Sequence, residues 1–351
     1  MINTSNSNLY GNNTVQRKQT TGTLVTSSTM VNQWVILSVY VFTFLIGLPA
    51  NLLAICTFFK KLGDKPSPND ILLFNLTVSD LLFLIFLPFK IYEAAMGMKW
   101  YLPQTLCSIS SYVFFTTIYT SSLLLMAISV NRYLGLAFPF KYRQIRRPKY
   151  AMGGSVLIWL ISASHCSIVF ITVHMQDNNG TANATANTTA PKNVCYEEFT
   201  NKQKRFLLPA RLEFFVVLYV VPLLVCVFCY INCIYILHTR PHITKEKKHR
   251  AIGMALCTLS IFLLCFLPYN TSHLIGYSSN KSPEWRYYTL LLSTLNTCLD
   301  PIVFYFSSST FRDKSRVSFL KVMHIRPWKP KGTTAEMTNV TNCYPKNSVT
   351  S

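Results

Sequence analysis

The sequence predicts an all-α integral membrane protein in which seven helices form one bundle. Three properties favour this fold class: half of the 351 residues are hydrophobic, only 13% are charged, and the formal net charge is +20. Soluble domains usually contain about 25% charged residues, and nucleic-acid-binding proteins with such a positive charge are usually less apolar. Sparse charge of one sign in an apolar chain is typical of a membrane protein whose cations lie on one side.

Seven apolar runs are each long enough to cross a membrane as a helix, which takes about 20 residues. The runs cover residues 34–59, 70–95, 104–137, 150–174, 207–237, 250–277 and 286–307. No repeat relates one half of the chain to the other, which argues against a transporter built from duplicated halves. We therefore expect an extracellular N-terminal segment at 1–33, a bundle at 34–307 and a cytoplasmic tail at 322–351.

The connections after the first, third, fifth and seventh runs are the basic ones, and by the positive-inside rule they are cytoplasmic. The N-terminus is then outside, and its polar first 30 residues contain no evident cleavable signal peptide. Glycosylation sequons in the predicted outer segments agree with this orientation. They begin at Asn3, Asn12, Asn179, Asn183 and Asn187.

Most of the 11 cysteines lie in the apolar runs, where a free thiol packs as a small hydrophobic group. Two cysteines differ, because Cys107 opens the third run at its outer end and Cys195 lies in the long outer connection. In an oxidising compartment these two could form a disulfide, and the alternative is two unrelated thiols.

Polar residues within spanning helices are costly, so they indicate function. Asp80 and Asp300 lie near mid-depth with Asn51, and Ser121 and Asn296 are placed to join them. Such oxygen-rich groups suit a small hard cation, so Asp80, Ser121, Asn296 and Asp300 form a candidate Na⁺ site. The alternative is a water-filled polar network in which one carboxylate is protonated.

Cationic and imidazole side chains gather in the outer half of the bundle. Arg211 lies within the first two turns of the fifth run, Arg286 opens the seventh, and His165 and His273 lie in the fourth and sixth. A guanidinium is suited to a carboxylate because it offers two parallel charge-assisted hydrogen bonds. The alternatives are that the arginines snorkel to the interface and that the histidines bond to neighbouring helices.

Together these residues resemble the rhodopsin-like family of G-protein-coupled receptors over about residues 34–320. The landmarks are Gly47-Leu-Pro-x-Asn51, Asn75-Leu-x-x-x-Asp80, Cys107, Arg132-Tyr133, Trp159, Pro222, Tyr230, Cys265-Phe-Leu-Pro268 and Asp300-Pro301. The resemblance implies a plasma-membrane receptor, not an enzyme, with a Cys107–Cys195 disulfide and an amphipathic helix at 308–321. It also implies coupling to heterotrimeric G proteins and to arrestin.

The same resemblance assigns residues to activation and G-protein coupling. They are Arg132, Tyr133, Tyr230, Phe266, Pro268, Asp300 and Pro301. Three positions depart from the family pattern: Asn131 replaces the usual acid before the arginine, Phe266 replaces a tryptophan, and Phe304 replaces a tyrosine. Since the acid holds the arginine in the resting state, we expect a weaker resting lock in this chain.

Several local segments resemble the short-chain free fatty acid receptors, numbered 2 and 3 in their family. Among them are Leu207-Leu-Pro-Ala-Arg-Leu-Glu213, Ser164-His-Cys-Ser167 and Ser282-Pro-Glu-Trp-Arg286. This resemblance makes Arg211, His273 and Arg286 the groups that bind a carboxylate. It places His165 and Tyr119 at the pocket floor, and it pairs Glu197 with the arginines in the empty receptor.

The expected ligands are acetate, propionate and butyrate, the expected G proteins are of the i/o and q types, and no cofactor is expected. The alternative ligand is another carboxylate, such as a hydroxy acid or a medium-chain fatty acid. A transporter or anion channel fits the buried cations but not the inner arginine and the other landmarks. An enzyme is not favoured, because no nucleophile–base pair or metal-ligand spacing stands out.

Overall fold

The computed structural model describes residues 12–64, 66–145, 147–173, 195–196, 199–240, 244–281, 283 and 285–322, without the side chains of 12–32, 145 and 318–322. Within these residues, seven helical stretches are long and apolar enough to cross a membrane. They are Gln33–Gly63, Pro68–Ala95, Gln104–Ala137, Pro148–Val173, Asn201–Thr239, Lys245–Ser278 and Arg286–Ser307. The predicted seven-helix bundle is confirmed.

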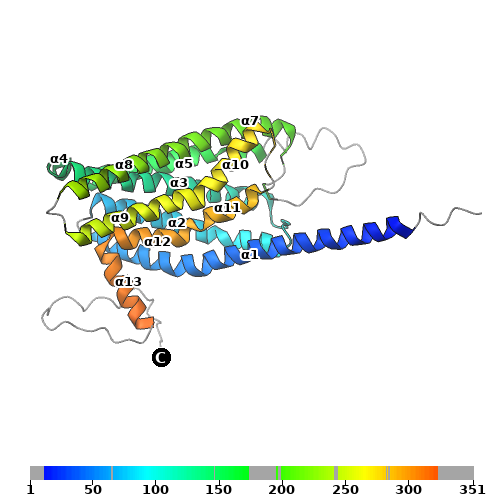
Figure 1. Ribbon diagram of the computed structural model, residues 1–351, viewed down its shortest axis with the longest axis horizontal. Helices are drawn as coiled ribbons and strands as arrows, with labels where there is room; N and C mark the ends of the chain where they lie inside the picture. Colours follow the sequence, from blue (N-terminus) through cyan, green and yellow to red (C-terminus); the bar gives the residue numbers. More distant parts are fainter. Residues whose placement is uncertain are drawn as a thin grey trace, which may run out of the picture.

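The helices lie roughly parallel along the long axis of the molecule (Figure 1). The first four spans contain α1 (Asn12–Gly63), α2 (Pro68–Ala95), α3 (Gln104–Ala137) and α5 (Pro148–Cys166), with the short α4 (Pro139–Ile145) between the last two. The fifth span consists of α7 (Asn201–Glu213), η1 (Phe214–Val220) and α8 (Val221–Thr239), and the sixth of α9 (Lys245–Ser260), η2 (Ile261–Phe266) and α10 (Leu267–Ser278). The seventh consists of α11 (Arg286–Thr294) and α12 (Asn296–Ser307), and α13 (Ser309–Val322) follows it.

Helix α1 begins well before the predicted bundle boundary at residue 34. Its backbone is helical from Asn12, through a stretch that contains no proline to break the helix. In Figure 1 this end of α1 projects beyond the other helices.

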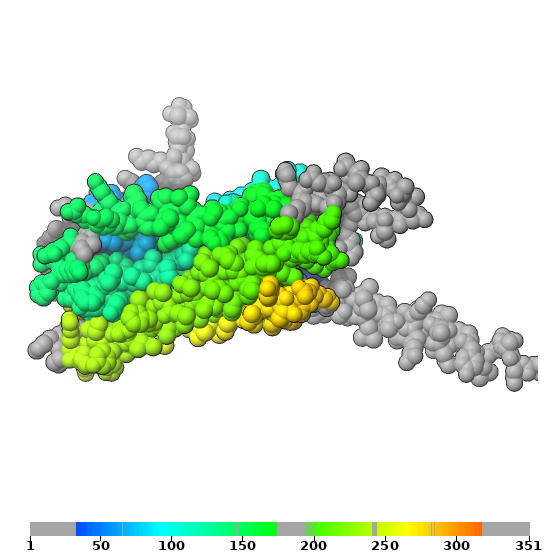
Figure 2. Space-filling view, turned by 90° about the horizontal axis from the view of Figure 1, so that it is seen from above, coloured from blue at the N-terminus to red at the C-terminus, as the bar shows by residue number. Residues whose placement is uncertain are grey.

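Helix α3 lies at the centre of the bundle and packs against α2, α5 and α8. Its side chains Leu124, Leu125 and Ile128 are fully buried. The peripheral helices instead expose large apolar side chains, such as Leu45, Leu160 and Leu224. Apolar exposure of this kind fits a lipid environment. Figure 2 shows α7 and α8 running beside α5 along one face of the bundle.

Two helices begin at capping boxes, in which a side chain and a backbone N–H are satisfied reciprocally. At α2, Ser67 caps the backbone N–H of Asp70, and the Asp70 carboxylate accepts from the Ser67 N–H at 3.0 Å. At α7, Thr200 and Gln203 form the same pair of bonds. The capping box at Thr200 explains why α7 starts six residues before the apolar run at 207.

The fifth and sixth spans each contain a π-helical turn directly before a proline-containing α-helical turn. Pro222 lacks the N–H that would bond the carbonyl of Leu218 in η1, and the Ser122 hydroxyl donates to that carbonyl at 2.9 Å. Two carbonyls of η2 also accept from side-chain hydroxyls. Tyr219 donates at 3.3 Å to that of Phe262, which also accepts from the Leu267 N–H, and Ser293 donates at 3.0 Å to that of Cys265. Side-chain hydroxyls therefore connect α3, η1, η2 and α11.

Helix α13 occupies the segment for which the resemblance implies an amphipathic helix, and it turns away from the bundle (Figure 1). The hydroxyl of Ser308 accepts from the N–H of Phe311 at its start. The buried ring of Phe311 stacks on Phe58 and meets Phe304 edge-on. These ring contacts fix the start of α13 against α1 and α12.

Helices α9 and α12 approach each other so closely that glycine is required at Gly253. A Cβ at this position would lie 2.5 Å from Cε1 of Phe306. We predict that Gly253→Ala lowers the thermal unfolding temperature, because overpacking typically costs about 1–3 kcal/mol. In a Phe306→Ala background the same change should raise it, because alanine favours a helix over glycine by about 1 kcal/mol.

Gly153 of α5 is the matched control, because a Cβ there meets nothing within 4 Å. Gly153→Ala should leave the unfolding temperature unchanged or raise it. Equal effects of Gly253→Ala in the two backgrounds would contradict the proposed contact with Phe306.

Candidate functional site

A small cavity of about 20 Å³ lies within the outer half of the bundle. This volume is close to the minimum that holds a water molecule. The cavity is lined by Phe115, Tyr119, Cys166, Ile168, Val169, Tyr196, Leu207, Arg211, Phe214, Tyr269, His273 and Arg286. Four of the predicted ligand-binding residues, from α3, α7, α10 and α11, therefore meet at one cavity.

Two guanidinium groups give this cavity its positive charge. Arg211 of α7 is buried, and its Cζ lies 5.2 Å from the centre of the Phe199 ring. Arg286, the first residue of α11, places its Cζ 5.4 Å from the Tyr269 ring and donates from Nη2 to the Tyr269 hydroxyl at 3.1 Å. No described residue that lines the cavity is acidic. Guanidinium groups offer charge-assisted hydrogen bonds, so the cavity suits an anion.

His273 and Tyr119 form the polar floor of the cavity. The His273 Nε2 and the Tyr119 hydroxyl lie 3.1 Å apart, and both side chains are buried. The Tyr269 ring meets the imidazole edge-on, with 4.6 Å between ring centres. The Nδ1 of His273 makes no hydrogen bond to any residue that the structure describes.

His165 does not lie where the resemblance implies, because it is absent from the residues lining the cavity. Its Nδ1 donates to the Ile161 carbonyl at 2.7 Å, and its Nε2 lies 2.9 Å from Oε1 of Glu213. These two bonds turn the imidazole towards α7. The alternative interpretation from the sequence, a bond to a neighbouring helix, matches this geometry.

Some predicted residues lie outside the described part of the chain. They are Glu197, the tail 323–351 and the sequon residues Asn3, Asn179, Asn183 and Asn187. Asn12 is the first residue of α1, and its side chain is not described.

Several aromatic residues of the cavity were not predicted from the sequence. Tyr269 lies four residues before His273, so helical spacing alone places both on one face. Tyr196 follows Cys195 directly, and its backbone has a positive φ of 57°. Its ring contacts Phe115 and Phe199. Burial beside Phe115 raises the pKa of Tyr196, which keeps the phenol protonated.

The predicted Cys107–Cys195 disulfide is present and joins the outer end of α3 to the segment carrying Tyr196. A buried ion pair lies next to it, with Lys90 Nζ 2.9 Å from Glu93 and 3.9 Å from the sulfur of Cys195. Lys90 therefore points into the protein. The bridge fixes Tyr196 at the edge of the cavity.

The predicted polar network lies at the middle of the bundle. Asp80, Asp300, Asn51, Ser121 and Asn296 are all buried. Neither carboxylate makes a well-formed hydrogen bond to another described residue, and the two are close enough to interact electrostatically. Two such carboxylates need a cation or a shared proton, so the oxygen donors fit a Na⁺ ion.

One amide and two serines in this network already have partners. Asn51 donates to the carbonyls of Gly47 and Thr297, both at 3.0 Å. Ser121 and Ser79 place their hydroxyl oxygens 3.3 Å apart. These bonds connect α1, α2, α3 and α12 around the carboxylates.

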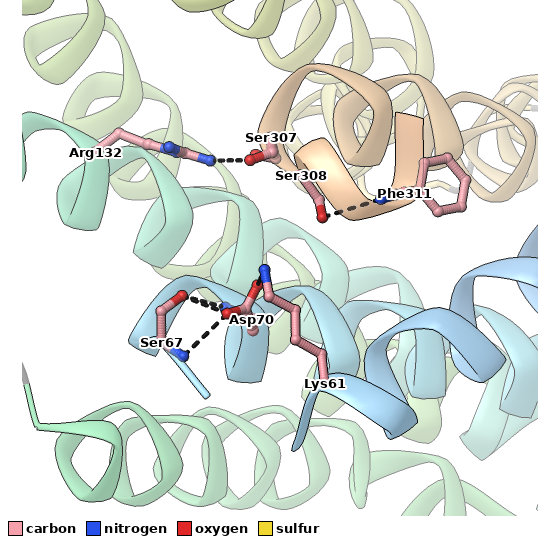
Figure 3. A network of polar contacts seen from close by, with 7 residues as sticks. All are labelled: Lys61, Ser67, Asp70, Arg132, Ser307, Ser308 and Phe311. Carbon is pink, nitrogen blue, oxygen red and sulfur yellow. Dashed lines mark hydrogen bonds and ion pairs between the residues drawn. The ribbon is translucent and has the colours of Figure 1, made fainter. Parts of the chain in front are cut away.

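At the inner end of α3, Arg132 reaches across to α12. Its Nη2 donates to the Ser307 carbonyl at 2.6 Å, as Figure 3 shows. Asn131, which stands in place of the usual acid, accepts from the Tyr142 hydroxyl of α4 at 2.6 Å. The partner of Arg132 is thus a backbone carbonyl at a helix C-terminus, where the dipole favours a cation.

The other residues assigned to activation lie at helix contacts. The Tyr230 hydroxyl donates to Thr258 at 3.0 Å and so joins α8 to α9. Tyr133 packs edge-on against Phe228, and the buried Phe266 packs edge-on against Phe262. Pro268 begins α10 just after η2, and Pro301 lies inside α12.

Comparison with known proteins identifies relatives that cover most of the chain. Residues 50–304 match the family described as 7 transmembrane receptor (rhodopsin family). Free fatty acid receptor 3 of Mus musculus is 47% identical over 289 residues, which is 82% of this chain and 87% of that protein. Free fatty acid receptor 2 of Rattus norvegicus is 44% identical over 280 residues, which is 79% of this chain and 82% of that protein.

The carboxylate pair of Asp80 and Asp300 predicts a dependence of stability on sodium. A ligand at ten times its dissociation constant stabilises a protein by about 1.4 kcal/mol. The unfolding temperature of the purified protein should therefore be higher in sodium chloride than in choline chloride of equal ionic strength. Asp80→Asn should abolish the difference.

The control is Asp70→Asn, which removes a carboxylate bound to Lys61 at the other end of α2. This variant should keep the sodium effect. Equal unfolding temperatures of the unmutated protein in the two salts would instead indicate that the carboxylates share a proton.

Proposed function

Because this chain belongs to the rhodopsin family of seven-transmembrane receptors, we propose that it senses a short-chain fatty acid and signals to heterotrimeric G proteins. Membership of this family agrees with the expectation that the chain is not an enzyme. The names of the relatives, free fatty acid receptors 2 and 3, support a fatty acid as the ligand.

The observation that carries this proposal is the convergence of Arg211, Arg286, His273 and Tyr119 on one cavity that contains no described acid. A carboxylate placed between the arginines accepts charge-assisted hydrogen bonds from both guanidinium forks. The Tyr119 hydroxyl and the imidazole of His273 then lie beside it as further polar partners. The aromatic walls suit a short alkyl tail.

The small number of atoms in a short-chain acid limits how tightly it can bind. A short-chain acid has about four to six heavy atoms, and at a ceiling of about 1.5 kcal/mol per atom it gains at most about 6–9 kcal/mol. This corresponds to dissociation constants from about tens of micromolar to sub-micromolar, and real values should be weaker. The ligand would therefore have to be abundant, as acetate, propionate and butyrate are in fermentation.

The geometry offers a route from the ligand to the inner face. The proposed carboxylate contacts α7, α10 and α11, so binding stabilises the arrangement in which their outer ends are close. The π-helical turn η2 and Pro268 form a pivot in the sixth span. Movement at this pivot would shift the inner end of α9. Tyr230 of α8 and Arg132 of α3 lie beside that end, near the proposed G-protein surface.

The proposed receptor has a defined orientation in the membrane and defined protein partners. The basic connections face the cytoplasm, and the N-terminus with its sequons faces the outside of the plasma membrane. The G proteins are of the i/o type, with the q type as an addition, and arrestin binds the phosphorylated tail. A second candidate ligand is another carboxylate, a hydroxy acid or a medium-chain fatty acid, for which the aromatic walls would have to open.

We predict that Arg211→Ala nearly abolishes the response. Removing one partner of a buried charge pair costs about 2–5 kcal/mol, or at least 30-fold in potency. The measurement is nucleotide exchange on a purified G protein with a series of acids from acetate to decanoate. Arg205→Ala is the matched control, because Arg205 is exposed on the same helix and does not line the cavity.

Potency that peaks at decanoate, or an equal loss in both arginine variants, would contradict the proposed ligand and site.

The proposed pairing of Glu197 with the arginines is tested in the same assay. Glu197→Ala should change ligand-free exchange or potency, and unchanged values for both Glu197→Ala and Glu198→Ala would rule the pairing out.

We also predict that Asn131→Glu lowers ligand-free exchange. The new carboxylate would compete with the Ser307 carbonyl for Arg132 and hold it in a resting position. Asn131→Gln is the control, because it has nearly the same shape and no charge. No decrease with glutamate, or an equal decrease with glutamine, would show that the charge at this position does not set basal activity.

A further inference from the structure

A second cavity, of about 580 Å³, lies at the inner end of the bundle, far along the helices from the cavity of Arg211. Residues from α1, α2, α3, α4, α8, α9, α12 and α13 line it. Five of the lining side chains are cationic: Lys61, Arg132, Lys247, Arg250 and Arg312. Asp70 is the one acidic residue among the described lining residues.

The carboxylate of Asp70 is already engaged. It lies 2.7 Å from Lys61 Nζ and accepts from the Ser67 hydroxyl at 2.6 Å and from the Ser67 N–H at 3.0 Å. Figure 3 shows this group apart from the contact between Arg132 and Ser307. Arg250 has its own partner in Glu246, an exposed residue of the preceding helical turn. Asp70 therefore cannot neutralise the remaining cations.

Two arginines are held in place by neutral groups. Arg132 donates to the Ser307 carbonyl at 2.6 Å (Figure 3), and Arg312 donates to the Tyr305 carbonyl at 2.9 Å. These carbonyls belong to the last turn of α12, where the helix dipole favours cations. These bonds fix the orientation of both guanidinium groups. Lys247 makes no ion pair with a residue that the structure describes.

We propose that this inner cavity binds a ligand that carries several phosphate groups. The positive-inside rule explains why cations lie on this side of the membrane, but not why side chains of α1, α3, α9 and α13 converge on one cavity. A single small anion cannot contact all four helices, whereas phosphates spread over a ring can. The volume falls within the usual range for small-molecule sites, about 300–1,000 Å³.

Guanidinium groups suit phosphate because both make bidentate charge-assisted hydrogen bonds. Asn69, Asn131 and the hydroxyl of Ser309 add neutral polar groups around the cavity. A polyphosphate bound here would cover Arg132 and Tyr230 and so compete with a G protein. The ligand is either the headgroup of a phosphoinositide lipid or a free inositol polyphosphate, because the two share this chemistry.

The experiment measures binding of fluorescent inositol hexakisphosphate to the full-length protein in nanodiscs of neutral lipid. Binding should be saturable and should weaken with salt. Lys247→Gln and Arg312→Gln should each reduce affinity about ten-fold, as expected when a charged hydrogen-bond donor is lost. Lys245→Gln is the matched control, because Lys245 is exposed on the same helix and does not line the cavity. Unchanged thermal unfolding of each variant shows that it is folded.

Nanodiscs that contain phosphatidylinositol bisphosphate distinguish the two sources. If the lipid headgroup occupies the cavity, it competes with the free probe, and apparent binding of the probe is weaker in these nanodiscs than in neutral ones. Unchanged binding indicates that the cavity binds the free polyphosphate. Absence of saturable binding, or an equal loss in Lys245→Gln, overturns the proposal in favour of diffuse surface charge. No fatty acid is present in this assay, so its outcome is independent of the function proposed for the outer cavity.

Discussion

Every backbone carbonyl that leaves the α-helical pattern inside the bundle must find a donor, because hydrocarbon supplies none. The hydroxyl of Ser122 meets this requirement at η1, where Pro222 supplies no N–H, and the hydroxyls of Tyr219 and Ser293 add bonds to carbonyls of η2. The three bonds join the third, fifth, sixth and seventh spans at the level just below the outer cavity. The positions of Phe214 and Tyr269, which line that cavity, depend on these connections.

On this framework, two guanidinium groups line the outer cavity, and none of the described residues lining it is acidic. Aromatic rings lie over Arg211 and Arg286, and cation–π contacts of this kind contribute about 0.5–2 kcal/mol. Such contacts reduce the cost of burying charge without replacing a counter-ion. The ligand proposed for this cavity would add a negative charge beside both guanidinium groups.

The sequence predicted all seven spans, because the length of an apolar run is a local property. A helix can continue beyond an apolar run into polar surroundings. α9 begins at Lys245, before the run that starts at 250, and α1 begins at Asn12, although its apolar span starts at Gln33, next to the predicted 34. The convergence of Arg211, Arg286, His273 and Tyr119 was also predictable once the family pattern was recognised. The partners of His165 and Arg132 were not predictable. The bond of His165 depends on how its ring is rotated, and Arg132 donates to a backbone carbonyl, which every residue carries and which the sequence therefore does not single out.

The π-helical turn η1 also changes which residues of the fifth span share a face. Arg211 and Tyr230 are 19 residues apart. In an uninterrupted α-helix of 3.6 residues per turn they would point about 100° apart. Both side chains are nevertheless buried in the bundle, at 4% and 2% exposure. A turn closed by i→i+5 bonds rotates less per residue than an α-helical turn. η1 thereby resets the helical phase, so that a ligand-facing arginine and an inward tyrosine near the opposite membrane surface can belong to one continuous helix.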